Sequence, residues 1–183
     1  MKVTALSILF IVIVFLISCN TEKVKPEVNN ELIGENLPDQ ESWNSTVFFT
    51  DSGKTRAVLY AGHLRTFDKT HETLLDSNIK VDFYNMNEIK TTTLTAKRGR
   101  VDEKTNNLYA MDSVVTVNDS GVVIRTDKMM WNNRQKKIVS EDFVTIVTPQ
   151  ERIEGYGFES DQNLRNYVIY NITYITNADS LKQ

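Results

Sequence analysis

Downstream of residue 43, apolar and polar residues alternate in short runs that are separated by polar turns. The clearest run is 79–83, in which every second residue is apolar, and this period is typical of a half-buried β-strand. The runs are rich in Val, Ile, Thr, Tyr and Phe, which favour strands. No window of about eleven residues carries a helical stripe of apolar positions, so the pattern predicts an all-β, antiparallel domain.

Turn sequences join several of these runs into hairpins. Asp51-Ser52-Gly53 and Asn118-Asp119-Ser120-Gly121 each separate two β-rich runs, and these residue types favour tight turns. Pro149 is the only proline after residue 38, so strand pairing is barely interrupted. We expect strands at 45–50, 54–60, 79–83, 92–96, 114–117, 122–126, 138–139, 143–148, 152–157 and 167–175.

A polar turn between two strands recurs at a nearly constant spacing. The turns begin at Asp102, Asn132 and Asp161, and a looser copy covers 67–76. Units repeated in this way stack their strands side by side and line one continuous apolar surface. The repeat therefore predicts a long curved sheet or an open roll.

Three carboxylates, Asp76, Asp112 and Asp142, occupy the same position in successive units. They could form a catalytic or metal-binding cluster only if they met at one point. Repetition instead spreads them along the sheet, where a short side chain commonly hydrogen-bonds the backbone at a turn or bulge. We therefore expect a structural role for all three.

The N-terminal segment has a different pattern. Lys2 precedes an apolar run over 5–17, which ends at Ser18 and the only cysteine, Cys19. The run is shorter than the roughly 18–20 residues that a membrane-spanning helix needs. The order fits a bacterial lipobox, in which residues 1–18 are a lipoprotein signal peptide and Cys19 is acylated. An ordinary signal peptide and a signal-anchor helix are the alternatives.

The segment 19–42 is polar, contains Pro26 and Pro38, and has neither a strand nor a helix period. These features predict a flexible tether behind the acylated cysteine. We expect the β domain to occupy 43–176 and a disordered tail to occupy 177–183. The domain has no cysteine of its own and hence no disulfide, so hydrophobic burial and strand pairing must stabilise it.

Composition and motifs exclude several kinds of function. The 21 basic and 24 acidic residues give a net charge of −3, without the basic excess of a nucleic-acid-binding protein. His71-Glu72 lacks the second histidine of a zinc-protease motif, and His63 is the only other histidine. The chain has neither a phosphate-binding loop nor a GxSxG element. We expect no catalytic residue, no metal site and no cofactor, and therefore no enzyme.

Several segments follow one another in the order of a known family: 94–102, 108–112, 115–117, 124–127 and the glycine-containing stretch 153–161. In this order they resemble the LptC family, the C component of the lipopolysaccharide-export system. The likeness covers about 43–175. Many family members keep an uncleaved transmembrane helix where this chain has a lipobox. The soluble periplasmic bridge protein of the same system shares the repeat, but the membrane tether favours the C component.

The resemblance implies a β-jellyroll that is open along one side and holds the acyl chains of lipopolysaccharide. The implied partners are the subunits of an inner-membrane ABC transporter, which delivers the lipid, and a periplasmic bridge protein with the same jellyroll, which receives it. Such domains would join strand to strand. The implied location is the periplasmic face of the inner membrane, with attachment through the N-terminal lipid.

Inward-facing apolar residues are candidates for the lipid-lining surface, although a packed core has the same pattern. Gly155 and Gly157 are candidates either for a strand edge offered to a partner or for a bulge or close backbone approach. The alternative function is a structural or adhesive envelope lipoprotein with a sealed β-sandwich and no lipid cargo. The lining candidates are Val81, Phe83, Leu94, Val115, Val117, Ile124, Trp131, Ile146 and Phe158.

Overall fold

The computed structural model describes residues 37–177, so Cys19, the expected signal peptide and most of the expected tether lie outside the described residues. Within this range the chain forms ten strands, which confirms the all-β prediction. None of the residues between 37 and 177 belongs to a helix that could cross a membrane. The strands are β1 (Gln40–Asp51), β2 (Lys54–Phe67), β3 (Glu72–Tyr84), β4 (Lys90–Ala96), β5 (Arg98–Asp102), β6 (Asn107–Asn118), β7 (Val123–Asn132), β8 (Lys137–Val147), β9 (Glu151–Asp161) and β10 (Tyr167–Asn177).

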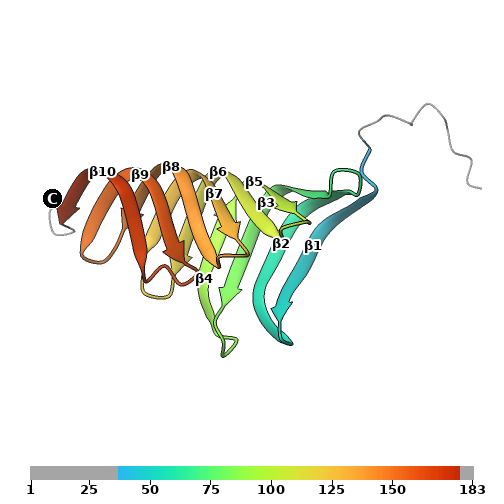
Figure 1. The fold of residues 1–183 in the computed structure, drawn as a ribbon, viewed down its shortest axis with the longest axis horizontal. Coiled ribbons are helices and arrows are strands. Elements are labelled where there is room, and N and C mark those ends of the chain that lie inside the picture. The colour runs from blue at the N-terminus through green and yellow to red at the C-terminus, as the bar shows by residue number, and fades with distance from the viewer. Residues whose placement is uncertain (1–36, 178–183) are drawn as a thin grey trace, which may run out of the picture. The chain divides into compact units, whose positions relative to one another are not determined.

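All ten strands belong to one antiparallel sheet in which successive strands are neighbours. The order is β1-β2-β3-β4-β6-β7-β8-β9-β10, and β5 pairs with β3 and β6. Since β4 pairs with the same two strands, β4 and β5 act as two parts of one strand interrupted at Lys97. Figure 1 shows the strands following one another from β1 to β10. β1 and β10, the first and last strands in this order, are therefore the edges of the sheet.

A line of β-bulges crosses the sheet and folds it in two. Register shifts interrupt the pairing of β2 with β3, of β6 with β7 and of β8 with β9. In the bulge of β6, Asp112 and Ser113 have φ angles of 66° and 55°. The Lys97 N–H donates to the Asp112 carbonyl at 3.1 Å, so the break between β4 and β5 lies on the same line. Bulges bend strands and increase their twist, which explains why the sheet folds in two along this line.

The two halves of the folded sheet are named here after β4 and β5. They pack face to face, as the rings of Phe83 in the β4 half and Trp131 in the β5 half show, with centroids 5.6 Å apart. One hydrophobic core fills the space between the halves. Opposite the bulges, the strand ends and turns of the two halves meet along a line that we call the seam. The β4 half comprises 45–51, 54–61, 79–84, 90–96, 114–118, 123–126, 143–147, 151–156 and 171–177, and the β5 half comprises 40–43, 63–67, 72–76, 98–102, 107–111, 128–132, 137–140, 158–161 and 167–169.

The three repeated carboxylates lie at the bulges, as the sequence predicts, but two of them bind arginine. Asp76 Oδ2 is 2.5 Å from Arg65 Nη2, and Asp112 forms an ion pair with Arg98. Asp142 lies in the bulge of β8. Among the described residues, no three His, Cys, Asp or Glu side chains are placed to hold a metal ion.

Both ends of the sheet extend past the expected domain limits. β1 begins at Gln40, inside the expected tether, and β10 continues to Asn177, inside the expected tail. The Asp39 N–H also donates to the Thr66 carbonyl at 2.8 Å. The first residues of β1 are mostly exposed, so they lack the apolar alternation by which a strand is recognised.

Candidate functional site

A cavity of about 500 Å³ opens at the seam, between the start of the sheet in the β4 half and strands β5 to β7 in the β5 half. Its volume lies in the range of about 300–1,000 Å³ that is typical of small-molecule sites. The inner wall is apolar and draws on both halves. It is formed by Phe49, Ala57, Val81, Phe83, Val101, Leu108 and Trp131.

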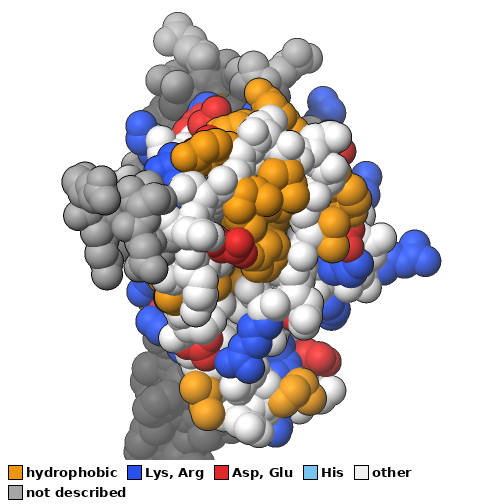
Figure 2. Space-filling view, turned by 90° about the vertical axis from the view of Figure 1, so that its left-hand side faces the viewer, with side chains coloured by type: hydrophobic (Ala, Val, Ile, Leu, Met, Phe, Trp, Pro, Cys, Tyr) orange, Lys and Arg blue, Asp and Glu red, His pale blue; other side chains and the backbone are white. Residues whose placement is uncertain are grey.

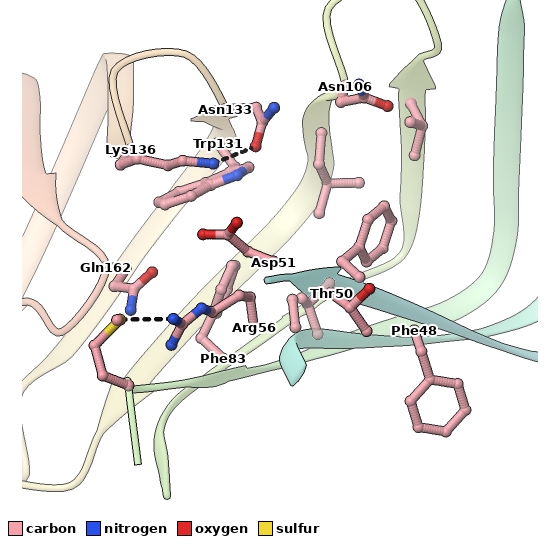
Figure 3. Close-up of a pocket in the computed structure, with 16 residues that line it drawn as sticks. Phe48, Thr50, Asp51, Arg56, Phe83, Asn106, Trp131, Asn133, Lys136 and Gln162 are labelled. Carbon is pink, nitrogen blue, oxygen red and sulfur yellow. Dashed lines mark hydrogen bonds between the residues drawn. The ribbon is translucent and has the colours of Figure 1, made fainter. Parts of the chain in front are cut away.

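Phe83 and Trp131 reach the cavity from opposite halves of the sheet (Figure 3). Their ring planes are tilted by 49°. Phe83 is 2% exposed, so its ring belongs to the core as well as to the cavity wall. The pair therefore holds the two halves together at the inner side of the cavity.

Polar side chains form the rim of the cavity. Arg56 Nη1 donates to the Asn85 carbonyl at 2.9 Å, and Lys136 Nζ donates to Asn133 Oδ1 at 2.9 Å. Figure 3 shows Asp51 and Arg56 beside the apolar side chains of the cavity. An apolar interior with a polar rim suits an amphipathic ligand whose charged part stays near solvent.

The cavity ends where the turn between β9 and β10 crosses the seam; we call residues 162–166 of this turn the strap. Gln162, the first residue of the strap, lines the cavity. Thr92 Oγ1 donates to the Gln162 carbonyl at 2.8 Å, and Asn118 Nδ2 donates to the Asn163 carbonyl at 2.9 Å. Leu164 is 1% exposed and packs in the core. The strap thus closes the seam beyond the cavity.

The β10 end of the sheet carries a second apolar surface. Ile172 and Ile175 pair with Gly155 and Ile153, which are buried, so both isoleucines continue the inner face of the sheet. They are nevertheless 53% and 54% exposed. Figure 2, which faces this end, shows hydrophobic side chains gathered at its centre. The inner face is therefore uncovered at its last strand.

The predicted lining residues separate into three groups. Val81, Phe83 and Trp131 line the cavity. Four others lie in the closed part of the core and are at most 3% exposed: Leu94, Ile124, Ile146 and Phe158. Val115 and Val117 belong to neither group.

The prediction was wrong for Val115 and Val117, which face outward. Their neighbours Val114 and Thr116 take the inner positions of β6 and are 1% and 0% exposed, whereas Val117 is 40% exposed. The Thr116 hydroxyl donates to the Met129 sulfur at 3.3 Å, which satisfies a polar group inside the core. Both faces of this part of β6 carry valine, so hydrophobicity alone selects the wrong one.

Gly155 and Gly157 do not lie on a free edge, which corrects the interface prediction. Strand β9 pairs with β8 on one side and β10 on the other. A Cβ on Gly155 would lie 2.4 Å from the Asn171 carbonyl oxygen, and Gly157 has a φ of 75° opposite the bulge of β8. The alternative prediction, a bulge or close backbone approach, describes Gly155 by its close approach to β10 and Gly157 by its place at the bulge.

Four residues that line the cavity are not among the predicted lining residues: Phe49, Ala57, Val101 and Leu108. The sequence does not show which face of β1 is the inner one, because two consecutive phenylalanines lie on opposite faces and either could point inward. The pairing of Phe49 with Ala57 puts Phe49 on the inner face, and Phe48 is 63% exposed. Only the partner strand distinguishes the two.

A family model described as "Lipopolysaccharide-assembly, LptC-related" matches residues 6–175, which include β1 to β9 and most of β10. No curated protein matches the chain.

Proposed function

The chain belongs to the LptC family, and on that premise we propose that it is a membrane-tethered periplasmic conduit for lipopolysaccharide. The family is a transport-component family that acts in lipopolysaccharide transport, in the periplasm and in association with the inner membrane. This chain would receive the lipid from an inner-membrane ABC transporter and pass it to a periplasmic bridge protein with the same jellyroll.

The observation that carries the proposal is the apolar cavity, which opens at the seam and has a polar rim. An acyl chain of about twelve carbons exposed to water costs on the order of 10 kcal/mol, at about 0.8 kcal/mol per methylene. The inner wall removes part of that cost. The open seam leaves a sugar and phosphate headgroup in solvent, which a closed barrel could not do.

The two edges of the sheet support transfer between domains. β1 and β10 each pair with only one strand among the described residues, so each can add a strand from another sheet. At β10 the uncovered Ile172 and Ile175 would continue the apolar inner face into the added domain. We propose the transporter and the bridge protein as the partners at the two edges.

Membrane attachment and the energy for directional lipid transport would not be supplied by the β-sheet itself. We propose that Cys19 carries the lipid that holds the protein at the periplasmic face of the inner membrane. The sequence contains no phosphate-binding loop, so the work of transport would come from ATP hydrolysis in the transporter.

One observation favours the alternative of a structural envelope lipoprotein without cargo. Leu94, Ile124, Ile146 and Phe158 fill a closed core, as a sealed sandwich requires. The two functions differ in whether acyl chains enter the cavity.

Site-specific photocrosslinking in cells tests the proposal. A photoreactive phenylalanine analogue at Phe49, inside the cavity, is expected to form adducts with lipopolysaccharide. The same analogue at Val117, on the outer face, is the matched control and is expected to form none. Adducts absent at Phe49, or equal at both positions, would leave the structural lipoprotein as the better account.

A further inference from the structure

The strap is one of three turns that occupy the same place in the repeat, and it alone of the three carries a buried apolar side chain. The turns follow Asp102, Asn132 and Asp161, and the third residue after each is Thr105, Gln135 and Leu164. Thr105 and Gln135 are exposed, whereas Leu164 is 1% exposed. The first two turns reach only the rim of the cavity, and the third reaches across the seam.

Polar contacts hold the strap to the ends of β3, β4 and β6. Besides the bonds from Thr92 and Asn118, Gln162 Nε2 donates to the Tyr84 carbonyl at 3.3 Å. Arg165 Nη2 lies 3.4 Å from Asp119 Oδ2. Each of these contacts joins the strap to a strand of the β4 half or to the turn after β6. None of them is part of the pairing of β9 with β10, so the strap can move away from the seam while that pairing stays intact.

Two features of the closed strap are unfavourable, and release would relieve the second, because the other two turns also contain a residue with a φ near 55°. Leu164 has a φ of 56°, a conformation that costs a residue with a side chain more than it costs glycine. The Oδ1 atom of Asn163 is buried without a hydrogen-bond partner, and water would supply one. The strap is therefore held closed mainly by the burial of Leu164 and by the contacts across the seam.

We infer that the strap is a releasable closure of the seam and that Leu164 is the plug that lipid displaces on its way to β10. The inference rests on the proposed function. The open cavity has the volume of a single small-molecule site, whereas a lipid with several acyl chains needs more of the space between the halves. Release of the strap would extend the cavity along the seam toward Tyr167 and the uncovered end of the sheet.

A covalent lock tests the inference. In the purified full chain with Cys19→Ser, Asp119→Cys and Arg165→Cys are joined by a short bis-maleimide, because two residues that meet through a long arginine side chain lie farther apart than a disulfide spans. A photoreactive analogue at Phe49 reports lipid in the open cavity, and one at Tyr167 reports lipid beyond the strap. Purified lipopolysaccharide is the probe, and each single-cysteine variant treated with the same reagent is the control.

We expect adducts at both positions without the lock. With the lock, adducts at Phe49 should persist and those at Tyr167 should fall at least tenfold. Equal adducts at Tyr167 with and without the lock would overturn the strap as a closure, and so would adducts at Phe49 with none at Tyr167 in the unlocked chain. Adducts at neither position in the unlocked chain would instead overturn the proposed function.

Removal of the plug gives the opposite change. Leu164→Gly removes the side chain at a φ of 56°, which glycine adopts readily, and Gln135→Gly removes the exposed side chain at the corresponding position of another turn, where φ is not positive. We expect Leu164→Gly to increase adducts at Tyr167 several-fold and Gln135→Gly to leave them unchanged. An unchanged yield in a folded Leu164→Gly protein, checked by circular dichroism, would contradict the plug.

Discussion

At the scale of single residues, Asp82 is a buried side chain on the outer face of β3 whose carboxylate stays charged. Its side chain is 5% exposed and lies 2.8 Å from Lys80 Nζ, and the Thr93 hydroxyl donates to it at 2.7 Å. Burial raises the pKa of Asp82, but the hydrogen bonds from Lys80 and Thr93 and the charges of Lys80 and Lys90 together lower it below the ordinary 3.8. The folded state therefore favours the carboxylate.

The substitution Asp82→Asn tests whether the charged carboxylate stabilises the folded state. A lowered pKa in the folded state stabilises the fold above about pH 3.8, and this contribution is lost as the pH falls through the folded value. We expect the variant to lose about 1.5–3 kcal/mol of unfolding free energy at pH 7, the range for hydrogen bonds to a charged group. The difference should shrink below about pH 4, as measured by urea denaturation, whereas Asp68→Asn at an exposed turn should change little. A difference that is constant from pH 7 to pH 3 would contradict the assignment.

Val114 and Val117 provide a second test, of which face of β6 is inside. Val114→Ala removes two buried methyl groups and should cost about 1.6 kcal/mol, at about 0.8 kcal/mol per group, plus a cavity contribution. Val117→Ala removes the same atoms from the outer face and should cost less than about 0.5 kcal/mol. Chemical denaturation of the two variants measures both values, and a larger loss for Val117→Ala would reverse the assigned faces.

At the scale of elements, β9 and β10 are joined by unusually close packing. The missing side chain of Gly155 leaves room for the β10 backbone, and the ring of Tyr170 lies over Gly157, with a carbon 3.1 Å from where a Cβ would be. The exposed edge of the sheet is therefore held in place through two glycines on its inner neighbour. In the proposed function, the partner-binding role that the sequence suggested for them is assigned to β10 instead.

Gly155→Ala should loosen β10 without unfolding the rest of the sheet. The added methyl group would meet backbone atoms of Asn171 and Ile172, which cannot move aside without breaking the pairing. We expect amide hydrogen exchange in β10 to accelerate at least tenfold, while β2 to β6 stay protected. Gly53→Ala is the control, because a Cβ there meets no atom within 4 Å and its cost is confined to the β1–β2 turn. Unchanged exchange in β10 would show that the close approach is unimportant.

At the scale of the whole domain, a single sheet folded on itself encloses a core but has no closing pair of strands. β1 and β10 do not pair with each other, so the structure keeps two edges and one seam. A closed barrel of the same strands would remove the edges and with them the means of joining other sheets. The open arrangement supports a function in which the domain is one segment of a longer assembly.

Lipid binding should be visible as added stability of the whole domain. A ligand that binds only the folded state stabilises it by about 2.7 kcal/mol at a hundredfold excess over Kd. We expect the melting temperature of the full chain to rise with lipopolysaccharide concentration, and core oligosaccharide without acyl chains to have no effect. An equal rise with the oligosaccharide would place binding on the surface rather than in the cavity.

Local sequence determined most of the strands of this protein and most of their turns, but no expected run covers β5 or the first parts of β3 and β6. The side-chain alternation of a strand has a period of two and needs no distant partner, so runs such as 79–83 could be assigned directly. The repeated turns were also local, since Asp102 Oδ1 accepts the N–H groups of Lys104 and Thr105 at 2.9 and 3.2 Å. The carboxylates at the bulges follow from the same repeat.

Only the tertiary structure decided which faces meet and where the space between them is open. On β7 the inner positions change from Ile124 and Thr126 to Met129 across a bulge, so alternation cannot be extended through it. Leu164 is buried because distant strands receive the strap, and turn composition does not reveal that contact. The division into cavity and closed core depends on packing between residues far apart in the chain, and a pattern of neighbouring residues contains no information about it.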